Sequence, residues 1–227
     1  MARPAKWEKP WEAARWPPLA VPSAHATSIT DVPLKSATDV CQTVVAAAND
    51  ALGQLRDFLN RYTKVIHGMN FDQVDRPWKS LYVGWLYTPE EVPKSLGETL
   101  NSEYFYNISL DAELVKTYNL MQRHAVALEQ LAWDHEELHT QFAQDFEDTE
   151  HHLLCVLAAL DVGVRFLRLE QPRPVGREAM SFGCRQMRGP AARMRDWLIL
   201  RHYTNLLEYV AQVFTGLQGH PAARFNY

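Results

Sequence analysis

Residues 131–146 read LAWDHEELHTQFAQDF and join the second and third of four amphipathic runs in this chain. The runs begin near Ser36, Ser109, Gln141 and Pro190. Proline and glycine gather in the first and third gaps, whereas the middle gap is short and contains neither. A helix lies parallel to its predecessor only if a long connection returns along the bundle, and a short connection makes the two antiparallel. The gaps therefore predict an all-α, up-up-down-down four-helix bundle with two long crossover loops.

The first run has the clearest helix boundaries. Ser36 and Asp39 have the spacing of a capping box at its start, and Gly68 is the expected end. Apolar residues recur at steps of three and four, which defines one helix face: Val40, Val44, Ala48, Leu52, Leu55, Leu59, Tyr62 and Ile66. The opposite face is polar and suits either a protein partner or plain solvation: Asp50, Gln54, Asp57, Arg61 and Lys64.

The later runs carry similar signals. Ser109 is the expected N-cap of the second helix. The fourth helix is expected to begin at Gly189 and Pro190 and to end at Gly219. No helix breaker separates the second and third runs, so the pattern alone permits one helix of about 60 residues, which base rates for globular domains disfavour. We place the required turn in the polar stretch 134–140.

The first long gap, residues 69–107, is rich in aromatic side chains. They are Phe71, Trp78, Tyr82, Trp85 and Tyr87, among others. A structureless connection of this length is uncommon in a compact domain. We therefore expect the segment to pack against the helices as a crossover.

Length and charge limit the class of protein. The chain has 227 residues, with 23 Lys+Arg against 27 Asp+Glu, and a single core can serve roughly 250 residues. The net charge is a mild −4, and the sequence contains no block of like charges. Neither nucleic acid nor an anionic membrane is therefore an expected partner. No stretch approaches the roughly 20 apolar residues of a spanning helix, so no membrane insertion is expected.

We expect one domain at residues 36–218, between flexible segments at 1–35 and 219–227. The N-terminal segment is rich in proline and lacks the clean apolar stretch of a signal peptide. The three cysteines are Cys41, Cys155 and Cys184. A first helix of about 30 residues is about 45 Å long, which separates Cys41 from Cys184 by more than a disulfide can span. Mostly free thiols are expected, as in a reducing compartment or in a secreted protein that depends on its core.

Residues 135–139 match the zinc motif HExxH. On a helix, His135 and His139 would hold the metal while Glu136 acted as general base. However, Glu137 puts a charge where such helices bury an apolar residue, and the glycine and third histidine of the longer motif are absent. We therefore expect a solvated helix end or turn, with no catalytic residue, no metal and no cofactor. A zinc-dependent hydrolase remains the alternative from the enzyme class.

Two segments carry a resemblance to a known family. One is the end of the first run, with LNRY at 59–62, GMNF at 68–71 and DRP at 75–77; the other is RMRDWLILR at 193–201. Together they resemble the ciliary neurotrophic factor, cardiotrophin and cardiotrophin-like cytokine group of the interleukin-6 family, over roughly Asp39 to Leu217. The resemblance implies an extracellular, secreted ligand without catalysis, and some members of the family lack a conventional signal peptide. Such a ligand brings class I cytokine receptor chains together, including a shared signal-transducing subunit, so that the associated kinases activate each other.

The resemblance also implies receptor-binding residues. The family's Phe-x-x-Lys motif at the start of the fourth helix falls on PAAR at 190–193, and FGCR at 182–185 has the aromatic spacing eight residues earlier. The implied contacts there are Pro190, Arg193 and Trp197, and those on the first and third helices are Asp57, Arg61, Gln144 and Glu147. Asn107 heads a glycosylation sequon if the chain is secreted. An intracellular helical adaptor without a receptor is the third possibility.

Overall fold

The computed structural model describes residue 34 and residues 36–219, which contain helices and no strands. The elements in chain order are α1 (Ala37–His67), α2 (Phe71–Asp75), η3 (Arg76–Trp78), η4 (Ser102–Tyr106), α3 (Leu110–Glu137), α4 (Ala143–Phe166), η5 (Arg177–Ala179), α5 (Phe182–Arg185) and α6 (Gly189–Gly219). The all-α prediction is therefore confirmed for the described residues. The expected flexible segments lie outside the described residues, except for Leu34 and for Gly219, which ends α6.

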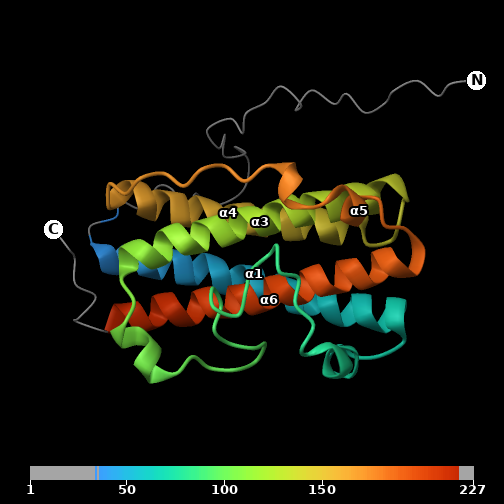
Figure 1. The fold of residues 1–227 in the computed structure, drawn as a ribbon, viewed down its shortest axis with the longest axis horizontal. Coiled ribbons are helices and arrows are strands. Elements are labelled where there is room, and N and C mark those ends of the chain that lie inside the picture. Colours follow the sequence, from blue (N-terminus) through green and yellow to red (C-terminus); the bar gives the residue numbers. More distant parts are fainter. Residues whose placement is uncertain (1–33, 35, 220–227) are drawn as a thin grey trace, which may run out of the picture.

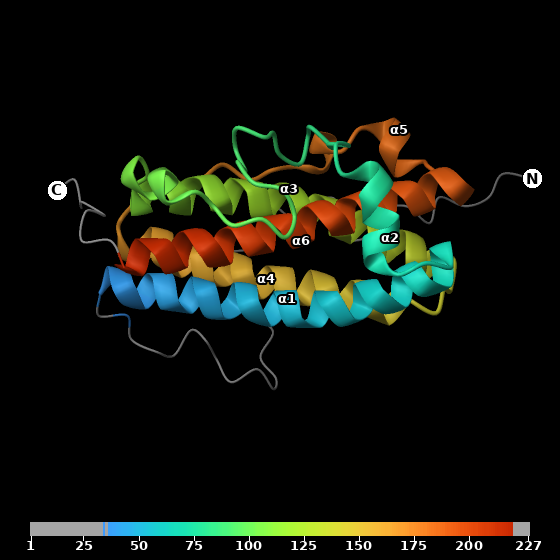
Figure 2. The ribbon, with the colours of Figure 1, turned by 90° about the horizontal axis from the view of Figure 1, so that it is seen from below.

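Four long helices, α1, α3, α4 and α6, lie side by side along the molecule (Figure 1). Helices α1 and α3 run in one direction, and α4 and α6 run in the other (Figures 1 and 2). Helix α1 packs against α4 and α6, and α3 packs against α4 and α6. Residues 68–109, the first crossover, lie along α6 and include α2, η3 and η4 (Figure 2). None of the helices in the described part of the chain is long and apolar enough to cross a membrane.

The boundaries of α1 agree with the sequence prediction. The Ser36 hydroxyl accepts a hydrogen bond from the Asp39 N–H at 3.2 Å, and the Asp39 carboxylate accepts one from the Ser36 N–H at 2.9 Å. This capping box satisfies two backbone donors at the start of the helix. Gly68 ends the helix in the left-handed region, with φ of 66°, where a residue without Cβ is not strained. Of the predicted apolar face only Ile66 is not fully buried.

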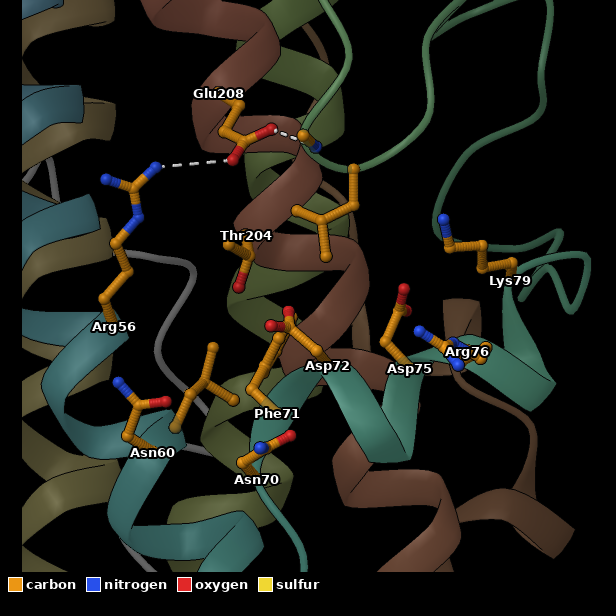
Figure 3. Close-up of a pocket in the computed structure, with 13 residues that line it drawn as sticks. Arg56, Asn60, Asn70, Phe71, Asp72, Asp75, Arg76, Lys79, Thr204 and Glu208 are labelled. Carbon is orange, nitrogen blue, oxygen red and sulfur yellow. Dashed lines mark hydrogen bonds and ion pairs between the residues drawn. The ribbon is translucent and has the colours of Figure 1, made fainter.

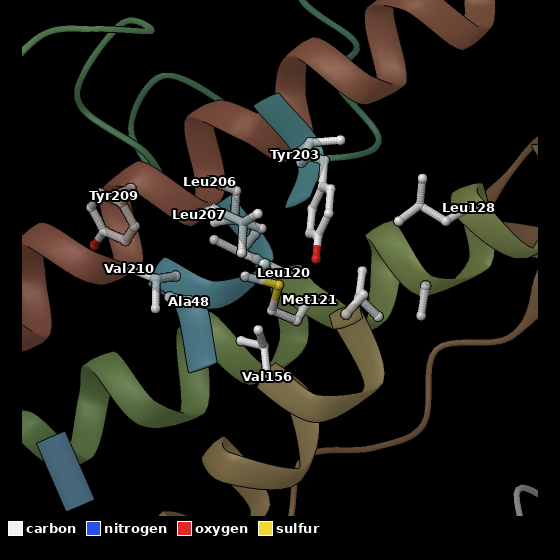
Figure 4. Close-up of a cluster of buried hydrophobic side chains, with 14 of the residues drawn as sticks. Ala48, Leu120, Met121, Leu128, Val156, Tyr203, Leu206, Leu207, Tyr209 and Val210 are labelled. Atoms are coloured by element: carbon white, nitrogen blue, oxygen red, sulfur yellow. The ribbon is translucent and has the colours of Figure 1, made fainter. Parts of the chain in front are cut away.

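All four long helices contribute to one hydrophobic core. Figure 4 shows part of it, where Ala48 of α1, Met121 of α3, Val156 of α4 and Leu207 of α6 meet. Each of these side chains is buried. Burying one large aliphatic side chain stabilises the folded state by about 1.5–3 kcal/mol, so this shared core, and not any single helix, stabilises the fold.

The connection between α3 and α4 follows the end of α3 at Glu137. Leu138 caps the helix, and His139 takes a left-handed conformation with φ of 49° before α4 starts at Ala143. The turn thus falls within the last part of the predicted stretch 134–140 and extends beyond it. Asp134 still lies within α3, where it is buried and its carboxylate accepts a hydrogen bond from the Gln130 side-chain amide.

The three cysteines are all free. Cys41 is buried in α1, while Cys155 and Cys184 are half-buried. The prediction of free thiols is therefore confirmed. Burial raises the pKa of the Cys41 thiol to about 11, and such a thiol is unreactive because the thiolate is the reactive form.

Candidate functional site

One end of the molecule, which we call the α6-start end, carries three exposed apolar side chains from different segments. There α1 and α3 end, and α4 and α6 begin (Figures 1 and 2). Met69 follows the end of α1, Leu138 caps α3, and Phe182 opens α5; they are 44%, 64% and 71% exposed. Single exposed apolar side chains are common, so the surroundings of each one decide whether it can serve as a contact for another protein.

Phe182 belongs to a short helix that is fixed to the rest of the protein. The Ser181 hydroxyl caps α5 by accepting a hydrogen bond from the Cys184 N–H at 3.3 Å. The guanidinium of Arg185 lies 6.0 Å from the centre of the Phe182 ring, at the limit of a cation–π contact. The Arg195 guanidinium of α6 donates to the Cys184 carbonyl at 3.0 Å. An exposed aromatic ring with a neighbouring cation is therefore held close to the first turns of α6.

A buried ion network supports this arrangement. Arg195 donates to Asp134 of α3 at 2.8 Å and to its neighbour Asp196 at 2.6 Å. Burial lowers the pKa of Arg195, but the two carboxylates outweigh burial and raise it overall. The guanidinium therefore stays charged and links α3, α5 and α6 at this end.

The HExxH motif does not have the geometry of a zinc site. His135 lies in the last turn of α3, whereas His139 lies beyond the helix, so the two do not share a helix face. The Nδ1 of His135 is 2.7 Å from the Thr140 hydroxyl, and its Nε2 is 3.2 Å from Asp196. Both ring nitrogens are thus engaged. Within the described part of the chain, no group of three or more His, Cys, Asp or Glu residues is placed to hold a metal ion. The prediction that this motif lies at a helix end is confirmed. The prediction that it is solvated is wrong for His135, which is buried.

The residues predicted at the start of the fourth helix separate into two groups. Pro190 and Arg193 lie exposed in the first turns of α6. Trp197 is fully buried, with its ring centre 5.0 Å from that of Phe71. Its assignment to a receptor contact is corrected, because its position in the helix turns the ring toward the crossover and away from solvent. Trp197 instead forms part of the core beneath this end.

The residues predicted on the first and third helices are all exposed. Asp57 and Arg61 are exposed on α1, and Gln144 and Glu147 are exposed on α4. Arg61 forms an ion pair with Asp145 of α4 at 2.5 Å, which brings the two sets together. An exposed pair of this kind adds little to stability. The four predicted side chains are accessible to a partner because each is exposed.

Asn107 lies exposed between η4 and α3. Its side-chain amide donates only a long hydrogen bond of 3.5 Å to the Glu103 carbonyl. The third residue of the sequon, Ser109, is the N-cap of α3, and its hydroxyl accepts from the Ala112 N–H at 3.3 Å. The predicted N-cap is therefore confirmed, and the Asn107 amide is accessible at the surface.

A cavity of about 650 Å³ lies between α1, α6 and the first crossover (Figure 3). Arg56 of α1 and Glu208 of α6 form an ion pair of 3.4 Å in its wall. Asp72, Arg76 and Lys79 of the crossover line the other side. Sequence analysis did not find this cavity, because its walls come from three segments whose contacts depend on how the crossover lies on α6.

A half-buried carboxylate in α4 is expected to destabilise the protein at high pH. Burial, followed by the charges of Glu129 and Glu147, raises the pKa of Glu150 to about 7. The unfolded chain loses this proton at lower pH, so the unfavourable contribution grows as the pH rises from about 4.5 to 7. We expect Glu150→Gln to raise the free energy of unfolding by about 2 kcal/mol at pH 8 and to change it little at pH 4.

Urea unfolding at both pH values measures this difference. The exposed Glu137→Gln is the matched control and should alter stability by less than about 0.5 kcal/mol at either pH. An equal gain for Glu150→Gln at pH 4 and pH 8 would contradict the electrostatic explanation.

Comparisons with protein-family models, curated proteins and solved structures find no match to this chain.

Proposed function

We propose that the four long helices form the up-up-down-down bundle of a long-chain cytokine, and that the protein is a secreted ligand that joins class I cytokine receptor chains. The helix directions, the short α3–α4 connection and the two long crossovers support this topology (Figure 1). The observation that carries the proposal is the exposed Phe182 ring, held beside Arg185 next to the start of α6.

The chemistry of the α6-start end suits a protein contact. Binding energy at such contacts concentrates in a few aromatic and arginine residues. Phe182 supplies an exposed aromatic ring, and Arg185 supplies a guanidinium group beside it. The buried Arg195 network holds these residues in place before binding, so less conformational entropy is lost on association. We infer that the functional aromatic of this chain is Phe182, and that Pro190 and Arg193, which are exposed in the first turns of α6, belong to the same receptor-binding end.

A ligand that joins receptor chains needs a second surface. The exposed surface of α1 and α4, with Asp57, Arg61, Gln144 and Glu147, is our candidate for the shared signal-transducing subunit. Its charged and amide side chains point to a more polar contact than the one at Phe182. Two chemically different faces on one small protein suit recruitment of two different chains.

Binding to class I receptor chains displayed on cells tests the proposal. We expect Phe182→Ala to weaken one receptor contact by about 30-fold or more, as truncation of a hot-spot residue does. Asp57→Ala combined with Glu147→Ala should leave that contact unchanged and weaken a second one. Affinity for single chains, measured by surface-immobilised receptor domains, separates the two contacts.

The control is Phe166→Ala, which removes an exposed aromatic ring at the opposite end of α4. It should change neither affinity. Failure of the unmodified protein to bind any class I receptor chain would overturn the proposal. Equal binding by the parent protein and Phe182→Ala would instead show that the contact lies elsewhere.

A further inference from the structure

The first crossover is fastened to α6 by a row of polar side chains. The row comprises Arg201, His202, Asn205, Glu208 and Gln212, whose crossover partners are Asp75, Val83, Lys94, Gly97 and Leu100 respectively. Spacings of three and four place these side chains on one side of a helix. Most of the contacts use backbone groups of the crossover, so residues 83–100 are fixed on α6 although they form no helix or strand.

His202 makes two hydrogen bonds that define its protonation state. Its Nδ1 lies 2.7 Å from the Leu198 carbonyl, which can only accept, so Nδ1 carries the proton. Its Nε2 lies 3.1 Å from the Val83 N–H, which can only donate, so Nε2 must be unprotonated. The neutral ring therefore fits the site, and a second proton would set two donors against each other.

A second histidine lies behind the same segment. The ring of Tyr87 in the crossover lies between His202, with ring centres 5.1 Å apart, and His124 of α3, with ring centres 5.9 Å apart. The Nδ1 of His124 is 2.8 Å from the Leu120 carbonyl, while its Nε2 is buried without a hydrogen-bond partner. Both histidines and Tyr87 are almost completely buried, so a proton on either ring would put a cation in the core.

The charged groups around this pair do not compensate such a cation. Arg201 and Arg123 lie beside the two histidines on their own helices and act against protonation. Among the described acids nearby, Asp75 is paired with Arg201, Glu91 with Arg123, and Glu208 with Lys94. The other titratable groups facing the rings are the phenols of Tyr82 and Tyr203.

Burial is the main cause that lowers the pKa of His202 to about 4 and that of His124 to about 3. Backbone carbonyls act in the opposite direction for both rings, and the neighbouring cations add to the lowering. An exposed histidine has a pKa near 6.5, so exposure of either ring is accompanied by proton uptake between about pH 6.5 and pH 4. Acid therefore favours any state in which this segment has left α6.

We propose that residues 83–94 form an acid-sensitive strap, which lies closed on α6 while His202 and His124 are neutral and detaches when they take up protons. Opening would expose the buried side chains of Leu86, Tyr87 and Val92. It would also disturb the cavity of Figure 3, whose walls include Lys79 and Leu96 on either side of the strap. This property belongs to the free protein and does not depend on receptor binding.

Hydrogen exchange of the full chain at pH 7 and pH 5, corrected for intrinsic exchange rates, tests the strap. We expect the opening equilibrium of strap amides such as Leu86 to rise about 20-fold for each histidine exposed. Core amides of α1 should respond less, because strap opening leaves that helix closed. If strap and α1 amides changed by the same factor, opening would be global and the proposal would be wrong.

Two variants separate the histidines from other acid effects. His202→Gln keeps an acceptor for the Val83 N–H, and His124→Phe keeps a ring against Tyr87, but neither replacement titrates. Each should remove about 20-fold of the pH response, and His124→Phe also replaces an unpaired buried nitrogen. The exposed His151→Gln on α4 is the matched control and should keep the full response. An unchanged pH response in both His202→Gln and His124→Phe would overturn the proposal.

Discussion

Replacement of Arg195 by methionine is expected to lower the free energy of unfolding by about 3–5 kcal/mol, the usual cost of removing one partner from a buried ion pair. Arg195 is 6% exposed and neutralises Asp134 and Asp196, which are also buried. Methionine fills a similar volume but leaves both carboxylates without their main cation. Helix α5 would also lose its hydrogen bond from α6, which the Arg195 guanidinium donates to the Cys184 carbonyl.

Arg193→Met is the matched control for this experiment. Arg193 lies on the same helix two residues earlier, but it is exposed. Its replacement should change stability by less than about 0.5 kcal/mol, while it weakens the proposed receptor contact. Urea denaturation at pH 7 measures both variants. A loss below about 1 kcal/mol for Arg195→Met would show that the network contributes little, as some buried ion pairs do.

The second large effect is expected for Phe146→Ala, which should destabilise the protein by about 3–5 kcal/mol. Phe146 is fully buried in α4, and its ring centre lies 5.0 Å from that of Phe58 and 5.8 Å from that of Tyr62, both in α1. The His135 ring of α3 stacks on it at 4.1 Å. One side chain therefore joins three helices beside the short α3–α4 connection, and its removal would leave a cavity that these rings cannot fill.

Phe166→Ala serves as the control for the Phe146 variant. It removes the same chemical group from the last residue of α4, where the ring is 39% exposed. Its cost should stay below that of Phe146→Ala, since Phe166 is already partly exposed to solvent and less apolar area returns to water. Thermal unfolding compares the two variants, and equal losses would contradict the assignment of Phe146 as the link between the three helices.

Local signals in the sequence predicted several helix boundaries correctly. The capping box of Ser36 and Asp39, the N-cap at Ser109 and the glycine at Gly68 act through neighbouring backbone groups, so a short stretch of sequence contains the whole interaction. The turn between α3 and α4 was harder to place. No breaker marks it, and buried rings such as Phe146, more than any turn residue, fix where the chain reverses.

The candidate site could be predicted only in part. Exposure of Arg193 and Pro190 agreed with expectation, but Trp197 proved to be buried. The sequence spacing could not decide between an inward and an outward ring for Trp197, because the crossover that covers it comes from residues near Phe71. The sequence likewise predicted a solvated position for His135, whereas its ring nitrogens lie within hydrogen-bond distance of Thr140 and Asp196.

By itself, the sequence determined the helical class, the free thiols and most helix ends, since these depend on periodicity, spacing and contacts within a few residues. The tertiary structure alone decided which polar residues are buried, where the turn between α3 and α4 falls and how the first crossover lies on α6. His202 and Val83 are far apart in the chain, and their contact exists only because packing brings the crossover onto the helix. Long-range contacts of this kind leave no periodic signal in a single sequence.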